Sequence, residues 1–158
     1  MKKALRIVTW SAFVFYCLVL VYIFIMDRIP HINIRWLSIR EFFIFSNFIP
    51  FKTLFEYIIK IKNDQINIDT AIINLVGNMI VFLPMGCFLP WLFKKFKSFK
   101  NTVLLVGGIV VAIEIMQIVF GVGSFDVDDI ILNVGGAMLG YAITSIPFII
   151  KIRDYIFP

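Results

Sequence analysis

The 158-residue chain is too apolar to form a water-soluble globule. Apolar residues make up 61% of it and charged residues only 16%, whereas soluble domains average roughly 45–50% and about 25%. So few charged side chains cannot cover the surface of a soluble fold. The net charge of +5 does not indicate nucleic-acid binding, because the basic residues cluster beside apolar runs. Residues 1–158 therefore suit one small integral membrane domain.

Four apolar runs are long enough to cross a bilayer, since a spanning helix needs about 20 apolar residues. The first run follows Lys2 and Lys3 and could be a signal peptide. It is longer than a usual signal-peptide core, however, and no small-residue cleavage site follows it, so we expect a retained helix. The sequence thus predicts an all-α membrane protein, a bundle of four transmembrane helices at 5–26, 71–93, 102–120 and 130–150.

Positive residues are concentrated on one side of this arrangement. With the N-terminus inside, nine Lys and Arg residues and one acid face the cytoplasm, whereas six Lys and Arg residues and eight acids face outward. The cytoplasmic excess occurs in three separate segments, at the N-terminus, at 94–100 and after residue 150. The positive-inside rule therefore predicts that both termini lie in the cytoplasm.

The outer segment 42–62, between the first two runs, is less regular. Its first part, 42–51 (FFIFSNFIPF), is apolar but too short to span, which indicates a re-entrant or interfacial stretch. The residues after Pro50 predict an amphipathic helix on the outer leaflet, because four apolar side chains can share one helical face. The alternative is an extracellular hairpin packed on the bundle. The four apolar residues are Leu54, Phe55, Ile58 and Ile59.

Polar residues inside the apolar runs are informative, because each costs a few kcal/mol in a bilayer unless it is paired or faces water. Three of the predicted helices carry amides or acids toward their outer ends, which indicates one shared outward-facing polar cavity. Alternatively, these groups bond one another across helices, at roughly 1 kcal/mol each. Glu114 favours a site, since packing alone needs no ionisable acid. The candidate binding residues are Asn74, Asn78, Glu114, Gln117, Asp126, Asp129 and Asn133.

The chemistry of such a site stays open. Glu114 is the candidate catalytic group, because a deeper carboxyl is better suited to act as a general acid or base. Asp126, Asp128 and Asp129 could supply oxygen ligands for a cofactor ion, Mg²⁺ or Ca²⁺, although they lack the spacing of a calcium loop. Acids that precede a helix also complement its dipole, which is the simpler interpretation. No nucleophile motif is present.

Four blocks of the chain form a recognisable set. They are 47–51 (NFIPF), 74–78 (NLVGN) followed by 82–86 (FLPMG), 114–117 (EIMQ), and 125–129 (FDVDD) with Asn133, Gly136 and Gly140. In this order they resemble the VanZ-like family of small bacterial membrane proteins, named for a protein associated with teicoplanin resistance. The resemblance adds Asn47 to the candidate binding residues. One departure is the stretch 121–125 (GVGSF), where many members carry an arginine.

The resemblance implies a multi-pass protein of the bacterial cytoplasmic membrane that reduces the action of glycopeptide or lipoglycopeptide antibiotics. We expect its partners to be membrane lipids and a cell-wall precursor or another amphiphile, bound by the polar cavity. A membrane enzyme that modifies a lipid-linked substrate is the alternative, with Glu114 as acid or base. An oligomeric transporter or scaffold is a third, because four helices are few for alternating access in a monomer. The oligomeric state is open.

Overall fold

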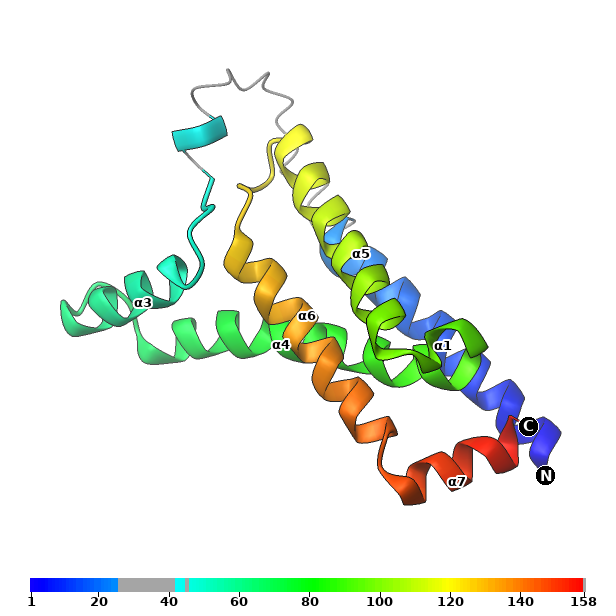
Figure 1. Cartoon of the computed structure of the whole chain (residues 1–158). Coiled ribbons are helices and arrows are strands. Elements are labelled where there is room, and N and C mark those ends of the chain that lie inside the picture. The colour runs from blue at the N-terminus through cyan, green and yellow to red at the C-terminus, as the bar shows by residue number, and fades with distance from the viewer. Residues whose placement is uncertain (26–41, 45, 158) are drawn as a thin grey trace.

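The protein is mostly helical in the part that the computed structural model describes, residues 1–25, 42–44 and 46–157. This confirms the predicted all-α class. The end of the first predicted span and residues 27–41 of the predicted outer loop lie outside these ranges. The helices in chain order are α1 (Lys2–Phe24), α3 (Lys52–Lys62), α4 (Ile68–Leu92), the 3₁₀ helix η2 (Lys94–Lys97), α5 (Phe99–Val119), α6 (Val127–Thr144) and α7 (Pro147–Ile156) (Figure 1).

Three of these helices, α1, α4 and α5, are each long and apolar enough to cross a membrane. A fourth crossing is possible if α6 and α7 count as one broken span, because the pair passes the same test together but is bent by 80°. The protein is therefore a multi-pass membrane bundle, as predicted. The fourth predicted segment, 130–150, differs from a single straight helix, since α6 ends at Thr144.

Pro147 explains the break between α6 and α7. A proline lacks the N–H that would continue the helix, and it disfavours the helical conformation in the residue before it. Ile146 accordingly has an extended ψ of 130°, and Pro147 occupies the first turn of α7. The proline therefore ends one helix and starts the next.

The most extensive contact between helices joins α4 and α6. Glycines make the close approach possible, because a Cβ added at Gly136 or Gly140 would overlap a backbone carbonyl of α4. On the other side, a Cβ at Gly86 would overlap the carbonyl of Ala137. Small residues allow this kind of backbone contact in membranes, where packing replaces the hydrophobic effect between helices. The two helices thus form the centre of the bundle.

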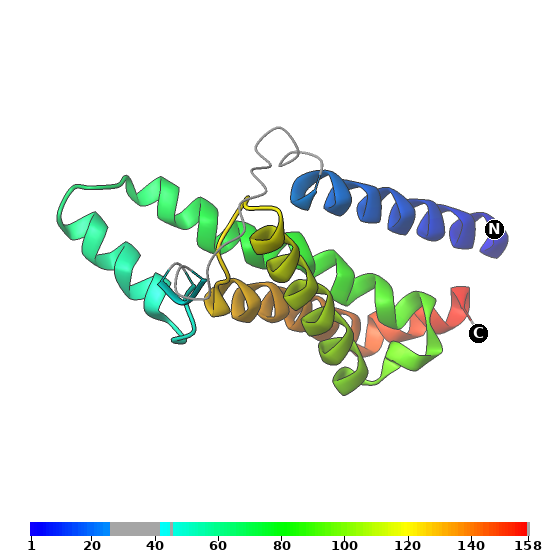
Figure 2. The same ribbon diagram turned by 90° about the horizontal axis from the view of Figure 1, so that it is seen from above.

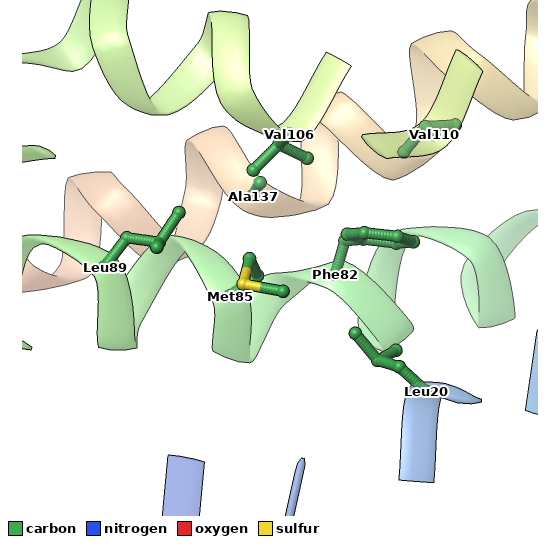
Figure 3. Close-up of a cluster of buried hydrophobic side chains, with 7 residues drawn as sticks. All are labelled: Leu20, Phe82, Met85, Leu89, Val106, Val110 and Ala137. Carbon is green, nitrogen blue, oxygen red and sulfur yellow. The ribbon is translucent and has the colours of Figure 1, made fainter. Parts of the chain in front are cut away.

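Apolar side chains fill the space around this central pair. Figure 3 shows Phe82, Met85 and Leu89 of α4 directed toward Val106 of α5 and Ala137 of α6. From α1 only Leu20 is buried in this cluster. Tyr16 adds a polar attachment, since its hydroxyl donates to the carbonyl of Val81 at 2.8 Å. Most other side chains of α1 are exposed, as expected of a helix that faces lipid on most sides.

The two termini lie at the same end of the molecule (Figures 1 and 2). The Arg6 guanidinium donates to the carbonyl of Ile156, and the Lys97 Nζ lies 3.5 Å from the Asp154 carboxylate. The Tyr141 hydroxyl also donates to the Lys97 carbonyl at 2.6 Å. These contacts join the three basic segments that the charge pattern places together on the cytoplasmic side.

Candidate functional site

At the opposite end of α6, a short backbone bridge joins two distant polar segments. The Asn47 N–H donates to the Phe125 carbonyl at 2.7 Å, and the Val127 N–H donates to the Asn47 carbonyl at 3.0 Å. Asn47 and Asp126 thereby form an isolated parallel β-bridge. The bridge brings the segment before α3 against the start of α6, so the NFIPF and FDVDD blocks of the sequence meet in space.

Asp126 lies at the centre of this junction. Its Oδ1 accepts hydrogen bonds from the Asn47 amide and the Asp128 N–H, both at 2.8 Å, and its Oδ2 accepts one from the Thr53 hydroxyl at 2.6 Å. The bond from Asp128 makes Asp126 the N-cap of α6, where an aspartate satisfies an N–H of the first turn. One carboxylate therefore connects α6, α3 and the segment before α3.

Asp128 caps the start of a different helix, α3. Its carboxylate accepts hydrogen bonds from the Phe51 N–H and from the Thr53 N–H, the latter at 2.7 Å. A negative charge at a helix N-terminus is favourable both as a hydrogen-bond acceptor and through the helix dipole. Because Asp128 is only 4% exposed, the structure uses it to fix α3 on α6.

Polar side chains of α4 and α5 also contact the first turns of α6. The Asn78 amide of α4 donates to the Asp129 carboxylate, and the Asn133 amide donates to the Asp129 carbonyl at 2.7 Å. The Glu114 carboxylate of α5 is 3% exposed and accepts the Asp126 N–H at 3.1 Å. Hydrogen bonds across helices, the alternative weighed from the sequence, therefore account for part of the polar cluster.

Two adjoining pockets open beside this cluster. The smaller, which we call the amide pocket, has a volume of ≈ 190 Å³ and lies between α3, α4 and the start of α6. The larger, which we call the lysine pocket, has a volume of ≈ 240 Å³ and lies between α3 and the segments around residues 46 and 124. Both are bordered by Thr53, Tyr57 and Asp126, so they share a wall.

The described residues that line each pocket are mostly polar. Those of the amide pocket are Thr53, Tyr57, Asn74, Leu75, Asn78, Asp126 and Asp129. Those of the lysine pocket are Ile44, Ser46, Asn47, Lys52, Thr53, Glu56, Tyr57, Lys60, Ser124 and Asp126.

The candidate residues from the sequence divide into two groups. The first group borders the pockets and consists of Asn47, Asn74, Asn78, Asp126 and Asp129. The second group is buried beside them, lines neither pocket, and consists of Glu114, Gln117 and Asn133. The Asn133 Oδ1 is buried and has no hydrogen-bond partner within the described ranges.

The aspartates do not assemble as a metal centre in the part of the chain that the structure describes. No group of three or more His, Cys, Asp or Glu side chains there could hold a metal ion. The carboxylates of Asp126 and Asp128 are instead directed at protein N–H and O–H groups. The candidate ligands Asp126, Asp128 and Asp129 therefore serve the two helix starts and the contact with Asn78.

Helix α3 contributes to both pockets, which was not predicted from the sequence. Lys52, Glu56 and Lys60 are spaced by four residues, and Thr53 and Tyr57 repeat that spacing one position later. Residues four apart lie on one helical face. The polar face of the predicted amphipathic helix therefore indicates this contribution, whereas the prediction rests on its apolar face alone.

Comparison with known protein families gives a match over most of the chain. The family model described as VanZ/LLP1 matches residues 13–150, which include all of the pocket-lining residues. No match was found among curated proteins or among solved structures. The chain therefore belongs to the VanZ/LLP1 family.

Proposed function

We propose that this protein acts at the bacterial cell envelope, linked to glycopeptide or lipoglycopeptide resistance, by binding the polar headgroup of a cell-wall precursor or membrane lipid in the amide pocket. The observation that carries the proposal is the lining of this pocket. Six of its seven described lining residues are polar, although two of its walls belong to helices of a membrane bundle. Polar groups at such positions are costly unless they serve a site or pair with one another.

Asn74 is the pocket residue that favours a binding role over a purely structural one. Asn78 and Asp129 bond each other, and Asp126 bonds Thr53 and Asn47. Asn74 also borders the pocket, but it is exposed, and its side-chain amide makes no hydrogen bond to the described part of the chain. Its amide is therefore available to a ligand, within a frame that the bonded residues hold in place. A preorganised frame lowers the ordering cost of binding.

The same contacts favour binding over acid–base catalysis. A general acid or base needs a carboxyl oxygen directed at the reacting group. The Asp126 and Asp128 oxygens are directed at protein donors, and a Glu114 oxygen accepts the Asp126 N–H. Binding of an amphiphile would alter the access of an antibiotic to its membrane-bound target without any covalent step.

Protection against teicoplanin in a susceptible bacterium tests the proposal. We expect Asn74→Ala to reduce the protection given by the full chain, with equal amounts of protein in the membrane. Asn67→Ala is the matched control, because Asn67 precedes α4, is exposed, makes no side-chain capping bond and lies outside both pockets. Full protection by Asn74→Ala, or equal losses in the two variants, would contradict a binding role for the amide pocket.

A further inference from the structure

Helix α3 carries three charged side chains in successive turns along the lysine pocket. The Glu56 carboxylate lies 3.8 Å from the Lys52 Nζ and 3.8 Å from the Lys60 Nζ, and all three side chains are about half exposed. One negative charge thus lies between two positive charges. We call Lys52, Glu56 and Lys60 the lysine row; its net charge is positive.

The two ammonium groups retain hydrogen-bonding capacity. A distance of 3.8 Å is longer than the roughly 2.7–3.2 Å of a protein hydrogen bond, so each contact is an ion pair through space. A lysine ammonium carries three donors. Within the described ranges, neither the Lys52 nor the Lys60 Nζ donates a hydrogen bond to another group of the chain. An anion in the lysine pocket could accept bonds from both.

The other face of α3 indicates where that anion comes from. Phe55, Ile58 and Ile59 are exposed and apolar, and no residue of α3 is fully buried. A helix with one basic and one apolar face is typical of the membrane interface, where its apolar side chains enter the acyl region and its lysines remain among the headgroups. The anionic groups at that level are lipid phosphates.

We infer that the ligand of the proposed binding site is a phosphate-bearing lipid. Its phosphate is held by Lys52 and Lys60 in the lysine pocket, and its hydroxyl or amide groups extend past Tyr57 into the amide pocket. The inference rests on the proposed function, and it adds the chemical class of the ligand. The two pockets have Thr53, Tyr57 and Asp126 in common as lining residues, so a headgroup that passes over Tyr57 would reach both. Lysine binds phosphate as a point charge, so the fit depends on charge more than on a fixed geometry.

Titration of the purified full chain with phosphatidylglycerol, followed by native mass spectrometry, tests the inference. We expect phosphatidylglycerol to bind more tightly than diacylglycerol, which lacks the phosphate. Lys60→Gln should weaken phosphatidylglycerol binding roughly five-fold, the size expected for one lysine at a lipid surface. Glu56→Gln should strengthen it by at least two-fold, because it removes the carboxylate that competes with the phosphate.

Lys62→Gln is the matched control for Lys60→Gln. Lys62 belongs to the same helix and is exposed, but it does not line the lysine pocket. We expect it to leave the dissociation constant of phosphatidylglycerol within two-fold of the unchanged chain. Equal losses in Lys60→Gln and Lys62→Gln would mean a general attraction to anionic lipid, and would overturn the inference. A Glu56→Gln variant with weaker binding would overturn it as well.

Two further measurements complete the test. One identifies the source of the phosphate, and the other distinguishes failure of the phosphate inference from failure of the proposed function. Displacement of phosphatidylglycerol by inorganic phosphate at equal concentration would point to a soluble ligand and overturn the lipid assignment. If Lys60→Gln binds phosphatidylglycerol normally while Asn74→Ala loses teicoplanin protection, only the phosphate inference fails. If both variants behave like the unchanged chain, the proposed function fails with it.

Discussion

The carboxylate of Asp128, at the start of α6, accepts a 2.7 Å hydrogen bond from the backbone N–H of Thr53, at the start of α3. The two residues are 75 positions apart in the chain. A helix usually receives its N-terminal cap from a residue next to it in sequence. Here the cap comes from another helix, so the same bond that completes α3 also attaches it to the bundle.

Asp128→Ala should therefore detach α3 as well as destabilise it. The loss leaves the N–H donors of Phe51 and Thr53 without their part-buried hydrogen bonds, which we expect to lower the free energy of unfolding by roughly 2 kcal/mol. Denaturant unfolding in detergent, followed by circular dichroism, measures this change. Asp69→Ala is the control, because Asp69 is an exposed acid in the first turn of α4 and should contribute less than about 1 kcal/mol. Equal effects of the two substitutions would argue against the cap.

Two adjacent glycines of α6, Gly135 and Gly136, should respond differently to substitution by alanine, so one serves as the control for the other. Gly136→Ala places a Cβ against the Met79 carbonyl, whereas a Cβ at Gly135 meets nothing within 4 Å. We expect Gly136→Ala to lower the unfolding midpoint strongly or to prevent assembly of the bundle. Gly135→Ala should be neutral or stabilising by up to about 1 kcal/mol, because alanine is the better helix former. A Gly136→Ala protein as stable as Gly135→Ala would mean that α4 and α6 do not touch at this point.

The position of α3 at the membrane surface can be measured with spin labels. In a background without Cys17 and Cys87, we expect a nitroxide at Phe55→Cys to collide mainly with oxygen, which concentrates in lipid. A nitroxide at the adjacent Glu56→Cys should collide mainly with a water-soluble nickel complex, because Glu56 belongs to the polar face. If both labels favour the nickel complex, α3 lies in water, and the extracellular hairpin is the better description.

The orientation of the bundle is tested by labelling single cysteines in intact cells. Ser124 borders the lysine pocket, and Ser98 lies next to η2 among the basic residues. A membrane-impermeant maleimide added outside should modify Ser124→Cys and leave Ser98→Cys unmodified until the cells are opened. The opposite pattern would place the pockets on the cytoplasmic side.

The membrane helices were predictable because the constraint on them is local. A bilayer demands a continuous apolar run with its backbone bonded internally, and both features can be recognised without knowledge of any neighbour. The break after Thr144 could also have been predicted, since a proline such as Pro147 indicates the end of a helix from the sequence alone. It was missed because the apolar run continues through it.

The site was predictable only in part, because its contacts link distant segments. Asn78 and Asp129 were both expected to border one polar cavity, and in the structure they are in contact. The role of Asp128 could not be derived, since its partner N–H groups belong to a helix start 75 residues away. Gln117 and Asn133 were expected in the cavity, but both are buried beside it. Periodicity assigns a residue to a helix face and does not say which neighbour covers that face.

The backbone contact between α4 and α6 has a mechanical consequence for ligand entry. With no side chains between Gly136 and the Met79 carbonyl, neither helix can slide along the other unless the two separate. Asn78 and Asp129, which belong to these helices, therefore keep a constant spacing across the amide pocket. The remaining wall is α3, which is attached through its first turn by Asp126 and Asp128. The last turn of α3 is joined to α4 by the short link 63–67, so this third wall is held at both ends and the pocket is formed before a headgroup enters.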